Sequence, residues 1–120
     1  MSNYENLNVW HKAVDLAVSI YKLTSSNMRL QKDYGLKEQM QRAAVSISSN
    51  ISEGDELGTD KQAVKQFYIS KGSAAELFTQ INISYKIGYI TEEQFKTLTN
   101  ECKTISSMLT NLIKSRIRSF

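Results

Sequence analysis

The sequence predicts an all-α protein, an antiparallel up-down-up-down left-handed four-helix bundle. Its 120 residues include no proline and only five glycines, which permits long helices and leaves few turn signals for a many-stranded sheet. Apolar residues recur every three or four positions through four segments, the spacing of amphipathic helices. A hydrophobic content of 41% is enough to build one core. We expect a single domain over residues 1–120, with helices at roughly residues 7–24, 36–54, 60–87 and 91–117.

The first predicted helix carries two neighbouring apolar stripes. Together they cover about half of the helix circumference, whereas one bundle core needs a face of only about 100°. The surplus predicts a second contact, either with more of the same bundle or with another subunit. Trp10, Val14 and Tyr21 are therefore candidate oligomer-interface residues. The stripes consist of Val9, Ala13, Leu16, Ile20 and Leu23, and of Trp10, Val14, Ala17 and Tyr21.

The second predicted helix is rich in small polar residues, as in "RAAVSISSNISEG". Serine and asparagine are weak helix formers, so this helix depends on tertiary packing. Ala43 and Ala44 beside Ile47 predict a close approach of neighbouring helix backbones. Ser46 is expected on the outer face.

Turn and capping signals separate the predicted helices. "SSNMRLQKDYG" interrupts the periodicity before the second helix, and "EGDELGTDK" forms a turn before the third. Thr59 or Asp60 is the expected N-cap of the third helix. Gly88 marks its C-terminal end, and Thr91 with Gln94 three residues later forms a capping-box pattern for the fourth.

The third predicted helix has a broad apolar arc that includes Ala75 and Phe78, and Lys71 projects into the middle of it. Two explanations stay open. Either the lysine stem packs against apolar neighbours while the ammonium reaches water, or the ammonium forms a buried or intersubunit ion pair. Lys71 is therefore a further oligomer-interface candidate. The fourth helix alternates apolar residues at spacings of three and four, the period of left-handed bundles.

No pattern in the sequence indicates catalysis, a cofactor or a metal site. His11 is the only histidine, on the polar side of the first helix, and Cys102 is the only cysteine. Cys102 falls in the apolar stripe of the last helix, where a thiol behaves as a small hydrophobe. Phosphate-binding glycine loops, calcium loops and the Glu-x-x-His pairs of di-metal bundles are absent from the sequence. We expect a protein that is not an enzyme and has no cofactor, metal or small-molecule substrate.

The N-terminal segment bears on cellular location. Acidic residues precede its apolar positions, and it lacks both a basic region and a continuous apolar core. Neither a signal peptide nor a membrane span is expected. A cytoplasmic protein is the resulting expectation.

Charge is distributed unevenly, although the formal net charge is only +3. Cations project from the last helix opposite its apolar stripe, which predicts contact with a phosphate backbone. The competing explanation is a solvated helix face that maintains solubility and complements the helix dipole. The candidate nucleic-acid-binding residues are Lys96, Lys103, Lys114 and Arg118.

An acidic turn opposes the basic tail, which we define as the cations after Glu101, namely Lys103, Lys114, Arg116 and Arg118. Glu53, Asp55, Glu56 and Asp60 lie between the second and third helices. In an up-down bundle this turn and the end of the last helix lie at the same pole. The tail and the turn are therefore able to pair, within or between subunits, which would neutralise the proposed nucleic-acid contact.

Three segments carry a resemblance to a known family. "VWHKAVDLAVSIYKLT", "YGLKEQMQRAAVSISSNISEG" and "SKGSAAELFTQINISYKIGYI", in this order and spacing, resemble the four-helix-bundle proteins named for open reading frames within intervening sequences of bacterial 23S ribosomal RNA genes. The resemblance extends from Leu7 to about Ile113. Three residues depart from the family pattern: Ser48 replaces a common proline, Gln41 an arginine and Phe78 a glutamate.

The resemblance implies a left-handed four-helix bundle that assembles into a ring-like homo-oligomer, with a pentamer as the expected form. The chain is also similar to the accessory protein of diversity-generating retroelements, a basic pentameric bundle that binds nucleic acid and a reverse transcriptase. We therefore expect a non-catalytic oligomeric scaffold that binds RNA or another nucleic acid. The alternative is a protein-interaction or structural oligomer without nucleic-acid binding.

Overall fold

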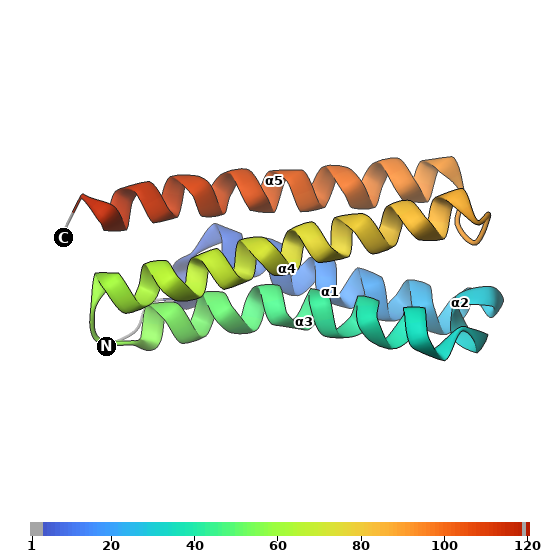
Figure 1. Cartoon of the computed structure of the whole chain (residues 1–120), viewed down its shortest axis with the longest axis horizontal. Helices are drawn as coiled ribbons and strands as arrows, with labels where there is room; N and C mark the ends of the chain where they lie inside the picture. The colour runs from blue at the N-terminus through green and yellow to red at the C-terminus, as the bar shows by residue number, and fades with distance from the viewer. Residues whose placement is uncertain (1–3, 119) are drawn as a thin grey trace.

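The computed structural model of the chain describes residues 4–118 and residue 120, and every regular element within them is helical. The four long helices lie side by side along the 46 Å long axis of the molecule (Figure 1). This arrangement confirms the all-α bundle predicted from the sequence. The elements are η1 (Tyr4–Asn6), α1 (Asn8–Ser26), α2 (Met28–Lys32), α3 (Tyr34–Glu56), α4 (Asp60–Lys86) and α5 (Glu92–Ile117).

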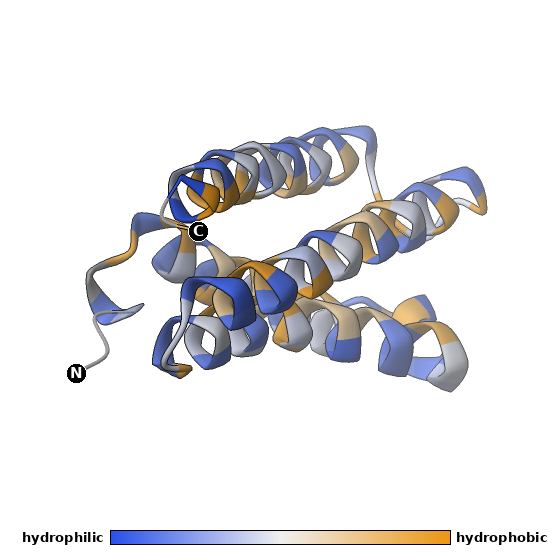
Figure 2. Cartoon of the chain, turned by 60° about the vertical axis from the view of Figure 1, so that its left-hand side comes forward, coloured by the Kyte–Doolittle hydropathy of each residue, from blue (hydrophilic) through white to orange (hydrophobic). Residues whose placement is uncertain are grey.

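Each long helix packs against two of the other three, so that α1, α3, α4 and α5 form the corners of the bundle in that order. The contacts of α4 with α3 and with α5 are the most extensive, and α1 meets α5 over the least surface. Hydrophobic residues recur at intervals along each long helix, as bundle packing requires (Figure 2). The α1–α5 contact is therefore the loosest side of the bundle.

The segment expected as a break before the second predicted helix is itself largely helical. Asn27 alone separates α1 from α2, and Asp33 alone separates α2 from α3. Asn27 Oδ1 accepts a hydrogen bond from Leu30 N at 3.0 Å, and Asp33 Oδ1 accepts one from Leu36 N at 3.2 Å. Each residue thus caps the helix that follows it. The sequence loses its periodicity because two caps and a short helix replace the expected loop.

The remaining helix ends agree with the capping signals in the sequence. Thr59 Oγ1 accepts from Gln62 N at 3.2 Å and caps α4. Thr91 and Gln94 form a complete capping box at the start of α5, with reciprocal hydrogen bonds of 3.1 and 3.0 Å. Gly88 has φ +81°, a left-handed conformation that glycine adopts without strain after a helix.

A polar latch joins the α2 corner to the α4–α5 connection. Asn27 Nδ2 donates to Tyr89 O at 2.7 Å, and Arg29 Nη1 donates to Gly88 O at 3.0 Å. The Tyr89 hydroxyl donates to Asp33 Oδ2 at 3.0 Å, a hydrogen bond that raises the pKa of the hydroxyl. Side chains of the short helix region therefore hold the connection between the last two helices.

Small residues bring α3 and α4 close together. Ala43 and Ala44 are buried, as expected from the sequence. Nearby, the buried Ser70 hydroxyl of α4 donates to the backbone carbonyl of Ile47 at 2.7 Å, a contact that requires a short distance between the two helices. The small Ser70 side chain at this contact therefore allows α3 and α4 to pack closely.

Gly54 continues this close contact at the end of α3. A Cβ atom on Gly54 would lie 2.9 Å from Phe67 Cε1 and 3.2 Å from the carbonyl oxygen of Ala63. Both neighbours belong to α4. Glycine is the residue that fits here because the α4 backbone and the Phe67 ring occupy the space of a side chain.

Two positions differ from the sequence-based expectation. Ser46, expected on the outer face of its helix, is half-buried, and its hydroxyl shares a 2.8 Å hydrogen bond with that of Ser73. Ala75, expected in the apolar arc, is exposed. The reason is that α4 makes its most extensive contact with α3. The buried face of α4 therefore includes the polar residues Gln80 and Ser84, and Ala75 lies outside it.

Gln80 carries a polar atom that is not satisfied inside the described part of the chain. The residue is 5% exposed, and its Oε1 atom has no hydrogen-bond partner there. A buried carbonyl oxygen that loses water without gaining a donor destabilises the folded state.

Replacing Gln80 with methionine should therefore stabilise the protein, because methionine keeps the length of the side chain and removes the unpaired oxygen. We expect a gain of about 1 kcal/mol in the free energy of unfolding, measured by urea denaturation. Gln41→Met is the matched control, since the Gln41 amide donates to Thr24 Oγ1 at 3.0 Å and its loss should not stabilise. A destabilised Gln80→Met variant would contradict this interpretation.

Candidate nucleic-acid interface

The cations proposed from the sequence lie along one side of α5, at spacings of seven, eleven and four residues, and all are exposed. Lys96 forms a 3.4 Å salt bridge with Glu92, but both side chains are well exposed and such pairs are weak in water. Beyond the first turn of α5 its only acidic residue is Glu101. We call the following residues the α5 basic surface: Lys96, Lys103, Lys114 and Arg118.

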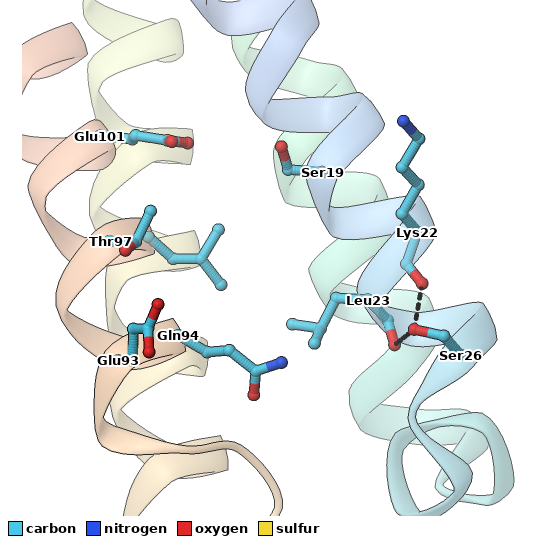
Figure 3. A pocket seen from close by; sticks show the side chains of 9 residues that line it. Ser19, Lys22, Leu23, Ser26, Glu93, Gln94, Thr97 and Glu101 are labelled. Carbon is cyan, nitrogen blue, oxygen red and sulfur yellow. Dashed lines mark hydrogen bonds between the residues drawn. The ribbon is translucent and has the colours of Figure 1, made fainter.

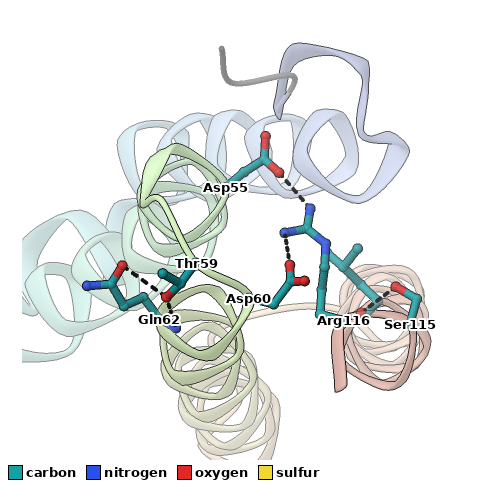
Figure 4. A network of polar contacts seen from close by, with 7 residues as sticks. Asp55, Thr59, Asp60, Gln62, Ser115 and Arg116 are labelled. Atoms are coloured by element: carbon teal, nitrogen blue, oxygen red, sulfur yellow. Dashed lines mark hydrogen bonds and ion pairs between the residues drawn. The ribbon is translucent and has the colours of Figure 1, made fainter. Parts of the chain in front are cut away.

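Arg116 connects the end of α5 to the acidic turn between α3 and α4 (Figure 4). Its Nη2 atom lies 2.6 Å from Asp55 Oδ1, and its Nη1 atom lies 3.6 Å from Asp60 Oδ1. The guanidinium also sits 5.4 Å from the centre of the Phe67 ring. The Asp55 side chain is 9% exposed and that of Arg116 24% exposed, so this contact is largely removed from water.

The pairing of basic tail and acidic turn expected from the sequence is thus present, through Arg116, the one cation of the tail that is not a nucleic-acid-binding candidate. Lys114 and Arg118 take part in no salt bridge within residues 4–118 and 120. Glu53 and Glu56 lie beside Tyr4 at a small hollow near η1. The acidic turn therefore leaves the α5 basic surface exposed.

The contact between α4 and α5 holds both cations and aromatic rings. Lys71 Nζ donates to Thr110 Oγ1 at 2.8 Å, so within the chain this half-buried ammonium has a hydroxyl partner. Lys103 Nζ lies 5.6 Å from the centre of the half-buried Phe78 ring. Phe78 packs against the core, as its place in the apolar arc predicts, but the sequence did not predict its contact with Lys103. The seven-residue spacing from Lys71 to Phe78 was the available signal, because it places both residues on the same side of α4.

The surface of α1 divides as its two stripes predict. The first stripe is buried. In the second, Val14 is half-buried and Tyr21 is 47% exposed, as is the neighbouring Val18. These residues line a mostly apolar groove of about 500 Å³ between α1 and α3. Trp10 packs against the Tyr4 ring at 5.3 Å between ring centres. Roles of Trp10, Val14, Tyr21 and Lys71 in an oligomer interface stay predictions.

A second groove follows the loose contact between α1 and α5 (Figure 3). Its two parts, of about 370 and 210 Å³, share Ser19 and Glu101. Burial raises the pKa of the Glu101 carboxyl, while Lys12 lowers it and Asp15 raises it to smaller extents. Mixed charges line this groove, so it is a poorer match for phosphate than the opposite side of α5.

The residues considered for catalysis have ordinary structural environments. His11 is exposed, and its Nε2 atom lies 2.6 Å from Glu5 O. Cys102 is buried as predicted, and burial raises the pKa of its thiol to about 12, so the thiol stays protonated at neutral pH. In the described part of the chain, no three His, Cys, Asp or Glu residues form a group suited to a metal ion. Among the described helices, none combines the length and apolar character that crossing a bilayer requires.

Replacing Arg116 with glutamine should destabilise the protein, because the largely buried Asp55 carboxylate would lose its 2.6 Å contact with the guanidinium. We expect a loss of about 2 kcal/mol in the free energy of unfolding, measured by urea denaturation. Arg118→Gln removes the same charge from an exposed position near the same end and should change stability by less than about 0.5 kcal/mol. Equal stability of the two variants would show that the Arg116 contact contributes nothing net.

Comparisons with known proteins agree with this structure. The family model described as 23S rRNA-intervening sequence protein matches residues 5–111. The fold is similar to a crystal structure of a protein of unknown function from the S23 ribosomal protein family of Bacteroides thetaiotaomicron, with a TM-score of 0.83 and 26% sequence identity over 88% of this chain and 98% of that one. No curated protein matches the chain. The chain therefore belongs to the 23S rRNA-intervening sequence protein family.

Proposed function

We propose that this protein is a non-catalytic, homo-oligomeric scaffold that binds RNA or another nucleic acid through the α5 basic surface, repeated in each subunit. One observation carries the proposal. Arg116 binds two carboxylates of the acidic turn, while Lys103, Lys114 and Arg118 stay exposed and outside salt bridges in the described part of the chain. The objection that acidic residues neutralise the basic tail therefore applies to one cation of the tail.

Phosphate is the ligand chemistry that suits this surface. Exposed cations at helical spacing follow a charged backbone without requiring a defined sequence. A net charge of +3 is small for one chain, but repetition in an oligomer would allow several weak contacts to act together. The fold neighbour's assignment to an S23 ribosomal protein family makes RNA the first nucleic acid to test.

The apolar groove beside α1 supports assembly. Val14, Val18 and Tyr21 leave part of this surface in contact with water, and burial against another subunit would remove it. The ring that the family resemblance implies, with a pentamer as its expected form, accounts for such a surface. A cytoplasmic location, expected from the N-terminal segment, completes the proposal.

The same α1 surface favours a second candidate function. A protein-interaction or structural oligomer would bury this groove and leave the lysines of α5 as an ordinary solvated face. The two candidates differ in one property, the affinity for nucleic acid at low salt.

Titration of the protein with labelled mixed RNA at two salt concentrations tests the proposal. We expect binding at low salt that weakens as salt rises, because phosphate contacts release counterions. The double variant Lys114→Gln, Arg118→Gln should bind more weakly, with a log–log salt slope shallower by about two if both residues contact phosphate.

The matched control is Lys32→Gln, Lys37→Gln, which removes two exposed or half-exposed cations at the opposite end of the bundle. It should leave affinity and salt slope close to those of the wild-type protein. Absence of binding at low salt would eliminate the nucleic-acid function and favour the interaction oligomer.

Replacing Val14 with glutamate tests the role of the α1 surface. If Val14 contacts another subunit, the mass measured by light scattering should fall toward the 13.6 kDa of one chain while helical circular dichroism stays intact. RNA affinity should fall as well, because the basic surfaces no longer act together. Met28→Glu, at a 68% exposed position on α2, should leave the mass unchanged.

Two results would count against this assignment. An unchanged oligomer would reject Val14 as an interface residue. Equal RNA affinity of monomer and oligomer would mean that assembly does not serve nucleic-acid binding.

A further inference from the structure

A groove between α4 and α5 lies beside the α5 basic surface. It measures about 230 Å³ and has a largely apolar lining. Small side chains such as Ala74, Ala75 and Ser106 leave space next to the half-buried Phe78 ring. We call it the Phe78 groove, lined by Ala74, Ala75, Phe78, Cys102, Lys103 and Ser106.

Cations and aromatic rings alternate along the two helices that form this groove. On α4, Tyr68, Lys71, Ala75 and Phe78 follow one another at spacings of three and four, which places them on one side of the helix. Tyr68 is 55% exposed. Seven residues separate Lys71 from Phe78 on α4 and Lys103 from Thr110 on α5, so the 2.8 Å Lys71–Thr110 hydrogen bond lies about two turns from the Phe78–Lys103 contact. Each helix thus supplies one ammonium group along this side of the bundle, Lys103 at the groove and Lys71 beyond it.

Most acidic residues of the same helices lie on other sides, and Glu92, which shares the side of Lys96 and Lys103, pairs with Lys96 at 3.4 Å. Glu76 does not share the spacing of Lys71 and Phe78 along α4. Glu101 lines the groove between α1 and α5, on another side of its helix. Asp60 binds Arg116 at the end of the bundle. A chain of phosphates running past the Phe78 groove would therefore meet cations.

We propose that the Phe78 groove holds an unpaired base of a single-stranded nucleic acid, stacked on the Phe78 ring, while Lys71 and Lys103 contact the neighbouring phosphates. The proposal rests on the nucleic-acid function proposed above and names the form of nucleic acid that the site selects. Lys103 now covers the ring, but this contact is partly open to water and its side chain is flexible. Its ammonium moves from the ring to a phosphate when a base enters.

The same chemistry disfavours a duplex in this groove. Bases within a duplex are stacked on one another, so their faces cannot reach Phe78 unless the helix opens. A duplex still offers phosphates to the α5 basic surface. The apolar lining of the groove recognises a ring face, which all bases share, and thus predicts little sequence preference.

The test compares an oligouridine strand with a blunt RNA duplex of equal length, by fluorescence anisotropy at one salt concentration. Phe78→Leu keeps an apolar side chain and removes the ring. We expect its affinity for the strand to fall between about five-fold and about 100-fold, the effect of losing one stacked base, with duplex affinity unchanged. Phe78→Tyr should retain strand binding.

The matched control is Tyr34→Leu. Lys37 Nζ lies 5.0 Å from the Tyr34 ring centre, a similar pair outside the groove, and Tyr34 is 72% exposed. This variant should bind strand and duplex as the wild-type protein does. Equal losses in Phe78→Leu and Tyr34→Leu would overturn the assignment of the groove.

A second measurement reports stacking directly and keeps an aromatic ring in the fold. Phe78→Trp combined with Trp10→Phe leaves one tryptophan, in the groove. Its fluorescence should be quenched by the strand and not by the duplex. Bound strand without quenching would overturn the proposal, and quenching by a short arginine-containing peptide but not by the strand would replace it with a protein partner.

The two proposals fail differently. A protein that binds neither strand nor duplex at low salt lacks the nucleic-acid function altogether. A protein that binds both equally, with strand affinity insensitive to Phe78→Leu, keeps that function and loses the base-stacking site.

Discussion

The close contact between α3 and α4 is the constraint on which the rest of the bundle depends. Ala43 and Ala44 of α3 are buried, and the Ser70 hydroxyl of α4 reaches the carbonyl of Ile47. Gly54 has no room for a Cβ atom beside Phe67. Because α4 also packs extensively on α5, these two contacts fix α4 between its neighbours and leave α1 with less surface to share with α5. The loose α1–α5 side follows from this unequal distribution of packing.

Polar contacts fasten the two ends of the bundle and decide which charges stay exposed. At one end Asn27, Arg29 and Asp33 hold the connection that contains Tyr89. At the other end Arg116 takes up two carboxylates of the acidic turn. Because Asp55 and Asp60 of this turn contact Arg116, they do not pair with the cations of the α5 basic surface. That surface therefore carries a local excess of positive charge, although the net charge of the chain is small.

Three grooves on the described part of the bundle differ in chemistry because different pairs of helices form them. The α1–α3 groove is apolar and suits another protein surface. Charges of both signs line the α1–α5 groove. The α4–α5 groove joins an aromatic ring to lysines, the combination found where proteins hold single-stranded nucleic acid. Under the functions proposed above, assembly and ligand binding use separate sides of one small bundle.

The sequence by itself determined the features that depend on neighbours along the chain. Helical periodicity located the long helices and the buried stripe of α1, and it placed Cys102 inside. Thr59 and Thr91 indicated where helices start, because the side-chain oxygen of an N-cap residue accepts a hydrogen bond from the backbone N–H three residues later. Charge counting along the chain found the α5 basic surface and the acidic turn.

Only the tertiary structure decided which residues meet across helices. Periodicity gives the angle of a residue around its own helix but not the position and angle of the helix beside it. Ser46 therefore shares a hydrogen bond with Ser73, Gln80 is buried, and Phe78 packs at the edge of the core with Lys103 beside its ring. The same limit explains why sequence placed several cations near the acidic turn, whereas the packing of α5 on α4 selects Arg116 as the one that reaches both Asp55 and Asp60.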